Sequence, residues 1–102
     1  MKKINKKSKK KVEKVDFYKS SRWIDLTKKV RDLYKCGCMK CSKENIETHI
    51  DHIFPRSLYP KFQYSIHNLQ ILCKDCNIEK SNKNNIDYRT AEQRKKCSIK
   101  YI

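Results

Sequence analysis

Residues 48–81 read THIDHIFPRSLYPKFQYSIHNLQILCKDCNIEKS, and this stretch decides the predicted fold. Its first part, which reads ETHIDHIF when the preceding residue Glu47 is included, alternates enough to predict a strand that carries Asp51 and His52 at its end. A long loop with both prolines follows, and LQILC, residues 69–73, is typical of a returning strand. Residues 74–83 then predict a knuckle that opens a short helix. Two strands, a long loop and a helix make one compact α+β unit.

The length and charge of the chain limit what else is expected. With 102 residues, the chain has room for one domain with tails. Its 26 Lys and Arg residues against 11 acidic residues give a net charge of +15, which concentrates polyanions and makes nucleic acid the first partner to consider. A lysine-rich coding bias alone is the alternative explanation of this charge. No apolar run approaches the roughly 20 residues of a membrane-spanning helix, so we expect a soluble protein without a membrane partner.

Three segments flank the central unit. Residues 1–15 form a lysine-rich block with few apolar residues, which predicts a flexible basic arm. From Ser21, apolar residues recur at helical spacing, with Ser20 or Ser21 as the N-cap, so an amphipathic helix is expected to end before Gly37. Trp23 on its apolar stripe is expected in the core rather than as a base-stacking residue. Residues 85–102 are a basic C-terminal segment with a short helix, in which the capping-box residues are Thr90 and Gln93.

Two Cys-x-x-Cys pairs predict a structural zinc site. Four thiolates are what a closed tetrahedral zinc site requires, and the ligands are Cys38, Cys41, Cys73 and Cys76. Disulfides or free thiols are the alternatives. Because no apolar segment follows the lysine-rich start, nothing marks the chain for secretion, and a reducing, cytoplasmic location favours metal over disulfides. Cys36 and Cys97 are left without an assigned function.

Asp51, His52 and Asn77 are candidate catalytic residues. Adjacent strand residues point to opposite faces, so Asp51 and His52 are expected to have different roles. A carboxylate suits a hard cation such as Mg²⁺, and a neutral imidazole is suited to take a proton from water. Asn77 follows the second knuckle directly, and its amide oxygen is a second candidate ligand for a hard cation.

The succession of a Cys-x-x-Cys pair, DHIFP and NLQILCKDCNIEK resembles the HNH endonucleases, which are metal-dependent nucleases of the ββα-metal (His-Me finger) fold. The resemblance covers residues 38–83 directly. It implies a nuclease domain over residues 16–84, with the N-terminal helix packed on it. FYKSSRWIDL, residues 17–26, also resembles the segment before the first knuckle in small phage and prophage members that are encoded near packaging genes.

The resemblance implies a role for each matched residue. His52 is expected to be the general base, and Asp51 and Asn77 are expected to hold one catalytic Mg²⁺ or Mn²⁺ ion. Asn68 is expected to orient the loop that presents the base. The expected reaction is hydrolysis of a DNA phosphodiester bond with little sequence preference, leaving a 5′-phosphate. Asn77 stands where the family name implies histidine, which shifts the expected metal preference toward magnesium or manganese.

Other polar residues carry weaker expectations. Arg56 and Lys80 are candidate phosphate contacts, although a lysine or arginine in so basic a chain is more often simply solvated. His49 and His67 are expected to be structural.

Two other classes of function stay open. One is a zinc-ribbon protein that binds DNA without cutting it, for example as an accessory to a phage packaging motor. The other is a protein–protein adaptor, which predicts no affinity for DNA. Phage packaging proteins are therefore candidate partners, and the oligomeric state is left open.

Overall fold

The structure is a computed structural model that describes residues 17–101. The expected basic arm, residues 1–15, lies outside the described residues. The described elements are α2 (Ser21–Tyr34), β1 (Thr48–His52), the short 3-10 helices η1 (Pro60–Phe62) and η2 (Ile66–Asn68), β2 (Leu69–Cys73), α3 (Lys74–Lys80) and α4 (Ala91–Lys100).

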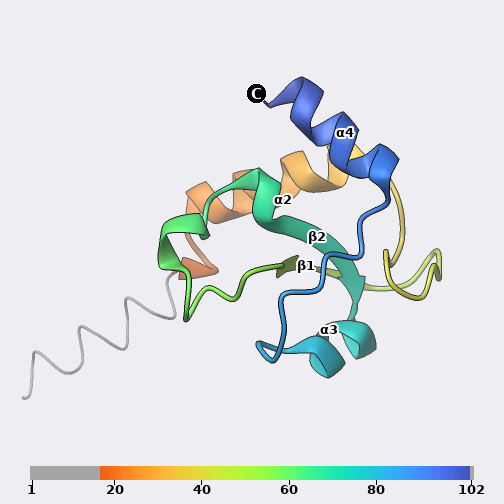
Figure 1. Ribbon diagram of the computed structural model, residues 1–102, viewed down its shortest axis with the longest axis horizontal. Coiled ribbons are helices and arrows are strands. Elements are labelled where there is room, and N and C mark those ends of the chain that lie inside the picture. The colour runs from red at the N-terminus through yellow and green to blue at the C-terminus, as the bar shows by residue number, and fades with distance from the viewer. Residues whose placement is uncertain (1–16, 102) are drawn as a thin grey trace, which may run out of the picture.

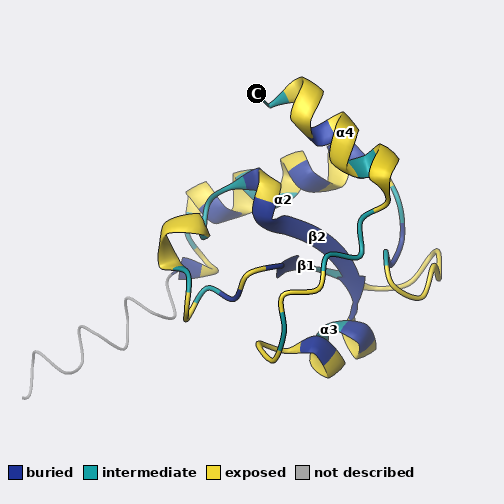
Figure 2. Ribbon diagram, viewed as in Figure 1, coloured by how far each residue is buried: buried dark blue, intermediate teal, exposed yellow. Residues whose placement is uncertain are grey.

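The two strands form an antiparallel hairpin in which Asp51 is opposite Gln70 and His52 is opposite Leu69. Every residue of β2 is buried because helices cover both faces of the hairpin. α2 and α4 lie on one side and α3 on the other (Figure 1), and the buried face of each helix is turned toward the strands (Figure 2). The expected α+β architecture, a ββα unit with a helix packed on it, is confirmed.

The N-terminal helix begins where the sequence indicated. Ser20 is the N-cap, and its hydroxyl oxygen accepts a hydrogen bond of 3.2 Å from the backbone N–H of Trp23. Trp23 is 6% exposed and belongs to the core, as expected. The helix ends at Tyr34 because Lys35 adopts the left-handed conformation, with φ of 45°.

The main core lies between α2, β2 and α4. Its buried members come from all of these elements, and they are Phe17, Trp23, Val30, Leu33, Tyr34, Ile66, Leu69, Ile71 and Cys97. The capping box of Thr90 and Gln93 is present at the start of α4, as predicted. The C-terminal helix is thereby fixed against α2 through the fully buried Cys97.

Gly37 permits the tight turn before the first cysteine pair. A Cβ atom at this position would lie 2.0 Å from the carbonyl oxygen of Lys43. The backbone N–H of Cys38 donates a hydrogen bond of 3.0 Å to the same oxygen. The single glycine of the chain therefore lets two backbone segments approach closely enough to form the knuckle.

Within residues 17–101, no helix combines the length and the apolar character that crossing a membrane requires.

Candidate active site and metal centre

A cavity of about 730 Å³ opens between α2, β1, the loop after β1 and α3. Asp51, His52 and Asn77 all line it, although they come from two elements. Arg31 of α2 and Arg56 of the loop line the same cavity. The structure thus brings the three candidate catalytic residues together in one polar site with two guanidinium groups.

Asp51 contacts two buried side chains, Gln70 and Lys80. Its Oδ2 atom accepts a hydrogen bond of 2.9 Å from Gln70 Nε2 and lies 3.2 Å from Lys80 Nζ. Its Oδ1 atom accepts no hydrogen bond within residues 17–101. Burial raises the pKa of Asp51, and the contacts with Gln70 and Lys80 partly offset this effect. One carboxylate oxygen is fixed by the protein, and the other is left for a ligand.

Lys80 is buried, whereas a phosphate contact would have to be accessible to DNA. Its side chain is 0% exposed, and its ammonium group donates hydrogen bonds of 3.1 and 3.2 Å to the carbonyl oxygens of His52 and Ile53. With Asp51, these groups enclose the charge completely. An ammonium group without solvent access does not reach a DNA phosphate, so the structure corrects this expectation. Lys80 instead ties the end of α3 to the end of β1.

His52 has a defined ring orientation. Its Nε2 atom lies 3.0 Å from the carbonyl oxygen of Gln63, and its ring stacks on Trp23 with centroids 4.9 Å apart. Because a carbonyl oxygen only accepts hydrogen bonds, Nε2 must carry the proton and Nδ1 must hold the lone pair in the neutral ring. Burial lowers the pKa of His52, which favours that neutral form.

Asn68 connects the two ends of the loop between the strands. Its Oδ1 atom accepts a hydrogen bond of 2.8 Å from the backbone N–H of Phe54. Its Nδ2 atom donates to the carbonyl oxygens of Phe54 at 3.1 Å and Phe62 at 3.3 Å. The loop that follows His52 is therefore fastened by a single buried amide.

Asn77 is half-buried in α3. This helix starts directly after β2, with Cys73 as its N-cap, so Asn77 is placed by the second knuckle. Within the described part of the chain, the side-chain amide of Asn77 makes no hydrogen bond. Its main-chain carbonyl oxygen accepts one from the backbone N–H of Ser81. The amide is therefore free to bind a ligand in the cavity.

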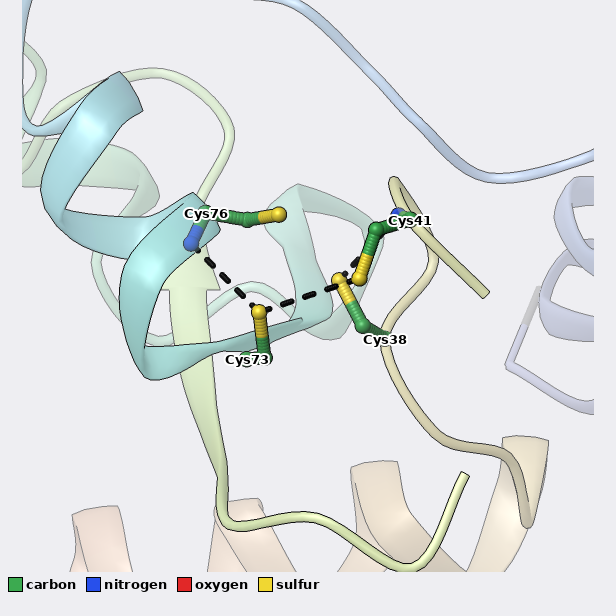
Figure 3. A group of neighbouring side chains, drawn as sticks. All are labelled: Cys38, Cys41, Cys73 and Cys76. Carbon is green, nitrogen blue, oxygen red and sulfur yellow. Dashed lines mark hydrogen bonds between the residues drawn. The ribbon is translucent and has the colours of Figure 1, made fainter. Parts of the chain in front are cut away.

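The predicted cluster of four cysteines is present. The sulfur atoms of Cys38, Cys41, Cys73 and Cys76 lie within 4.8 Å of one another. Figure 3 shows the two pairs pointing toward one another, the first from the loop after Gly37 and the second from the β2–α3 junction. In each pair the second residue donates its N–H to the first sulfur at 3.4 Å. Two such knuckles around one point are the donor set of a structural zinc site.

The charge state of the cluster also fits a cation. Burial opposes ionisation of Cys38, but backbone N–H groups of Cys41, Cys73 and Lys40 lower its pKa to about 6. Burial and hydrogen bonds from the other sulfurs raise the pKa of Cys76 to about 12. Four neighbouring sulfurs do not ionise together without a positive charge between them, and a bound metal ion supplies that charge.

Residues 38–83, which include both knuckles, the hairpin and α3, match the family model described as HNH endonuclease. This segment of the chain is therefore similar to an HNH endonuclease domain. Searches of curated proteins and of solved structures return no match.

One element outside the matched segment, α2, contributes two residues to the site. α2 supplies Trp23, which stacks on His52, and Arg31, which lines the cavity. Arg31 also donates hydrogen bonds to Thr48, of 2.5 Å to Oγ1 and 2.9 Å to the carbonyl oxygen. Sequence reasoning did not single out Arg31, because helical spacing indicates only that it is exposed.

Gln70, within the matched segment, is the second site residue, after Arg31, that the sequence analysis did not identify. It stands in the apolar strand LQILC and is 0% exposed. Besides Asp51, it contacts the segment after α3, with hydrogen bonds of 3.1 Å to Ile86 O and 2.7 Å from Tyr88 N. A polar residue within a strand that is otherwise apolar was the available signal, because a buried amide requires partners.

The remaining cysteines and histidines have different surroundings. Cys36 and Cys97 lie outside the four-cysteine cluster. His67 is placed between Cys97 and the carbonyl oxygen of Tyr101, away from the cavity. His49 lines the cavity, and its Nε2 atom lies 3.2 Å from Glu47 Oε2 without forming a hydrogen bond within residues 17–101.

Proposed function

We propose that this protein is a divalent-metal-dependent DNA endonuclease. The observation that carries the proposal is the single cavity in which Asp51, His52 and Asn77 meet beside two arginines, within a segment that matches the HNH endonuclease family. A carboxylate, an amide oxygen and a neutral imidazole are the groups required to bind a hard cation and to activate water. Hydrolysis of a phosphodiester bond uses both capacities.

Asp51 and Asn77 would hold the catalytic cation. The Oδ1 atom of Asp51 and the side-chain amide of Asn77 are without hydrogen-bond partners among the described residues, and both residues line the cavity. Oxygen ligands of this kind suit Mg²⁺ or Mn²⁺. When bound, such an ion neutralises the charge that develops on the scissile phosphate and its leaving oxygen.

His52 would act as the general base through Nδ1. Its Nε2–H is directed to Gln63 O, so the lone pair on Nδ1 is available to take a proton from water. The water oxygen then forms a bond to phosphorus while the bond from phosphorus to the 3′ oxygen breaks. The released 3′ oxygen takes up a proton from solvent, and the phosphate stays on the 5′ end. Trp23 and Asn68 would keep the ring in place through stacking and through the loop.

Zinc would be the structural metal in this account. The four cysteines join the loop before β1 to the start of α3. Asn77 lies in this helix, four residues after Cys73. A filled zinc site stabilises the fold directly. Its proposed function is to fix α3 against β1, so that Asn77 faces Asp51.

DNA is the proposed substrate, and contact through the phosphates is expected to give little sequence preference. Arg56 is held by Gln63, with Nε 3.1 Å from Oε1, and lies over the ring of Phe17 at 3.9 Å. Arg31 stands on the α2 side of the same cavity. Arg56 is kept as a proposed phosphate contact, and Arg31 takes the place of Lys80.

One observation favours the alternative, a zinc-held module that binds DNA without cutting it. The ion pair between Lys80 and Asp51 places a positive charge 3.2 Å from the carboxylate that would bind the cation. A compensated carboxylate attracts a divalent ion less strongly than an isolated one. Both functions predict zinc and DNA binding, so only an assay of cleavage separates them.

The test is nicking of supercoiled plasmid by the zinc-loaded protein, with Mg²⁺, Mn²⁺, Ni²⁺ or no added cation. We expect nicking that depends on the added cation and falls by at least about 100-fold in His52→Ala, because general-base catalysis contributes about that much. DNA binding by the variant should be retained.

His67→Ala is the matched control, because His67 lies outside the cavity. This variant should nick plasmid at the rate of the unmodified protein. Equal nicking by His52→Ala and the unmodified protein would contradict the proposed mechanism. Binding of DNA without any cation-dependent nicking would favour the alternative.

The biological setting is part of the proposal. The resemblance of residues 17–26 to the corresponding segment of small phage and prophage nucleases supports processing or packaging of phage DNA. None of the six cysteines forms a disulfide and four of them are the proposed zinc ligands, which is typical of a reducing, intracellular compartment. Co-purification with proteins of a packaging motor tests this setting.

A further inference from the structure

Leu58 is an exposed apolar side chain that follows directly, in sequence, on residues lining the candidate active site. It is 69% exposed, which is the largest value among the large apolar side chains of residues 17–101. Single exposed leucines are common on protein surfaces. The position of Leu58 is less common, because it follows directly on Pro55, Arg56 and Ser57, which line the cavity.

The turn that carries Leu58 is well supported. The backbone N–H groups of Leu58 and Tyr59 donate to the carbonyl oxygen of Pro55 at 3.1 and 2.8 Å. Tyr59 packs edge-on against Phe54 with ring centroids 5.0 Å apart, and stacks on Phe62 at 6.2 Å. Leu58 lies next to this aromatic cluster in sequence but remains largely outside it. The structure therefore holds an aliphatic side chain outward on an ordered turn.

A second exposed aliphatic side chain comes from α3. Ile78 is 62% exposed, lines the cavity and follows Asn77. We call Leu58 and Ile78 the apolar rim: Leu58 follows cavity-lining residues in sequence, and Ile78 lines the cavity, which also contains Arg31 and Arg56. Arginines beside the cavity and a net charge of +15 favour a polyanion on this face. The apolar parts of duplex DNA are its base stacks, which side chains reach through a groove.

We propose that Leu58 inserts as a wedge into a base step of duplex DNA from the minor groove, while Ile78 contacts the groove wall. This inference rests on the proposed function for its substrate class. A wedge costs the unstacking of one base step, and it is inserted most easily at flexible pyrimidine–purine steps such as TA and CA/TG. The apolar rim would then give a phosphate-binding enzyme a preference for deformable DNA.

The test measures base unstacking without cleavage. Zinc-loaded protein, without added Mg²⁺ or Mn²⁺, is bound at saturation to short duplexes that carry 2-aminopurine at successive positions. We expect a fluorescence increase of about threefold or more at a TA or CA step, because an inserted side chain breaks the stacking that quenches this base. Leu58→Ala should lose most of the increase at saturating protein, with Ile78→Ala showing a smaller loss.

Ile99→Ala is the matched control, since Ile99 is 67% exposed on α4 and does not line the cavity. It should give the full increase. An equal increase with Leu58→Ala, or no increase on saturated binding of the unmodified protein, would overturn the proposal. Loss of the increase in all three variants would also overturn it, because the effect would not be specific to the rim.

A second assay separates this proposal from the proposed function. On a duplex with a mismatch, which is already unstacked, Leu58→Ala should nick at the rate of the unmodified protein, whereas on a matched duplex it should be about tenfold slower. The same deficit on both substrates would contradict the wedge. If no variant nicks any substrate, the proposed endonuclease activity fails, while the fluorescence result still decides whether Leu58 is inserted.

Discussion

His52 and Lys80 illustrate how single side chains define the candidate site. The His52 ring is fixed by two contacts, stacking on Trp23 and a hydrogen bond to Gln63 O, and the main-chain carbonyl oxygen of His52 accepts a hydrogen bond from the side chain of Lys80. Lys80 links that carbonyl oxygen to the Asp51 carboxylate. The candidate base and the candidate metal ligand are therefore positioned by the same buried ammonium group.

The ionisation of His52 gives a prediction at the residue scale. Because burial lowers the pKa of His52 in the folded protein, the unfolded chain takes up a proton at higher pH than the folded one. The contribution of His52 to the free energy of unfolding is fully present above its ordinary pKa of about 6.5. This contribution is lost as the pH falls from there through the lowered pKa of the folded protein. NMR titration of the imidazole, without the catalytic cation, should give a midpoint below about 6.5.

The same shift should place the acidic limb of the nicking rate below that ordinary value, because Nδ1 must be unprotonated. A midpoint for His52 above its ordinary value would show that burial does not govern its charge.

Lys80 gives a second prediction at this scale. Lys80→Met keeps the length of the side chain but leaves the buried Asp51 carboxylate without its cation and two carbonyl oxygens without a donor. Removing one partner of a buried pair costs about 3–5 kcal/mol. Urea unfolding followed by circular dichroism should show a loss of this size, whereas Lys83→Met, at an exposed position, should change stability by less than about 0.5 kcal/mol.

At the scale of elements, the hairpin and helices were predictable from sequence, and the tertiary network was not. The alternation in ETHIDHIF, the apolar run LQILC and the capping box of Thr90 and Gln93 are local signals, and each element was found where they indicated it. Lys80 was misassigned because its motif position shows nothing about burial. The stacking of Trp23 on His52 joins residues 29 positions apart, which no local pattern reveals.

The metal knuckles connect these elements, and removal of the metal is the matching prediction. The pair of Cys73 and Cys76 forms the start of α3, so loss of the metal should loosen that helix and then the whole small domain. Atomic spectroscopy should find one zinc per chain, and a strong chelator should abolish the cooperative unfolding transition. Cys38→Ser should lower the zinc content, and Cys36→Ser should not.

Zinc retained at one ion per chain in Cys38→Ser, or a chelated protein that unfolds as the zinc-loaded protein does, would show that these cysteines do not hold the fold together.

At the scale of the whole molecule, the charge and the cavity act together. A net charge of +15 attracts polyanions to the surface in general, but only one described cavity combines a carboxylate, an imidazole and two guanidinium groups. Composition alone indicated the polyanion, and the cysteine spacing and the DHIFP sequence indicated the nuclease family. The addition of Arg31 from α2 required the three-dimensional structure, because it lies outside the segment that matches the HNH model.

The proposed mechanism depends most on a divalent cation held between Asp51 and Asn77. The measurement that tests this directly is titration of Mn²⁺ into the zinc-loaded protein, with free Mn²⁺ followed by electron paramagnetic resonance. We expect one ion bound per chain, and affinity at least about tenfold weaker in Asn77→Ala, because a lost ligand costs about 1.4 kcal/mol or more. Asn82→Ala, at an exposed position that also lines the cavity, should bind as the unmodified protein does. Equal Mn²⁺ affinity in Asn77→Ala and the unmodified protein, or no bound Mn²⁺ at all, would contradict the proposed cation site.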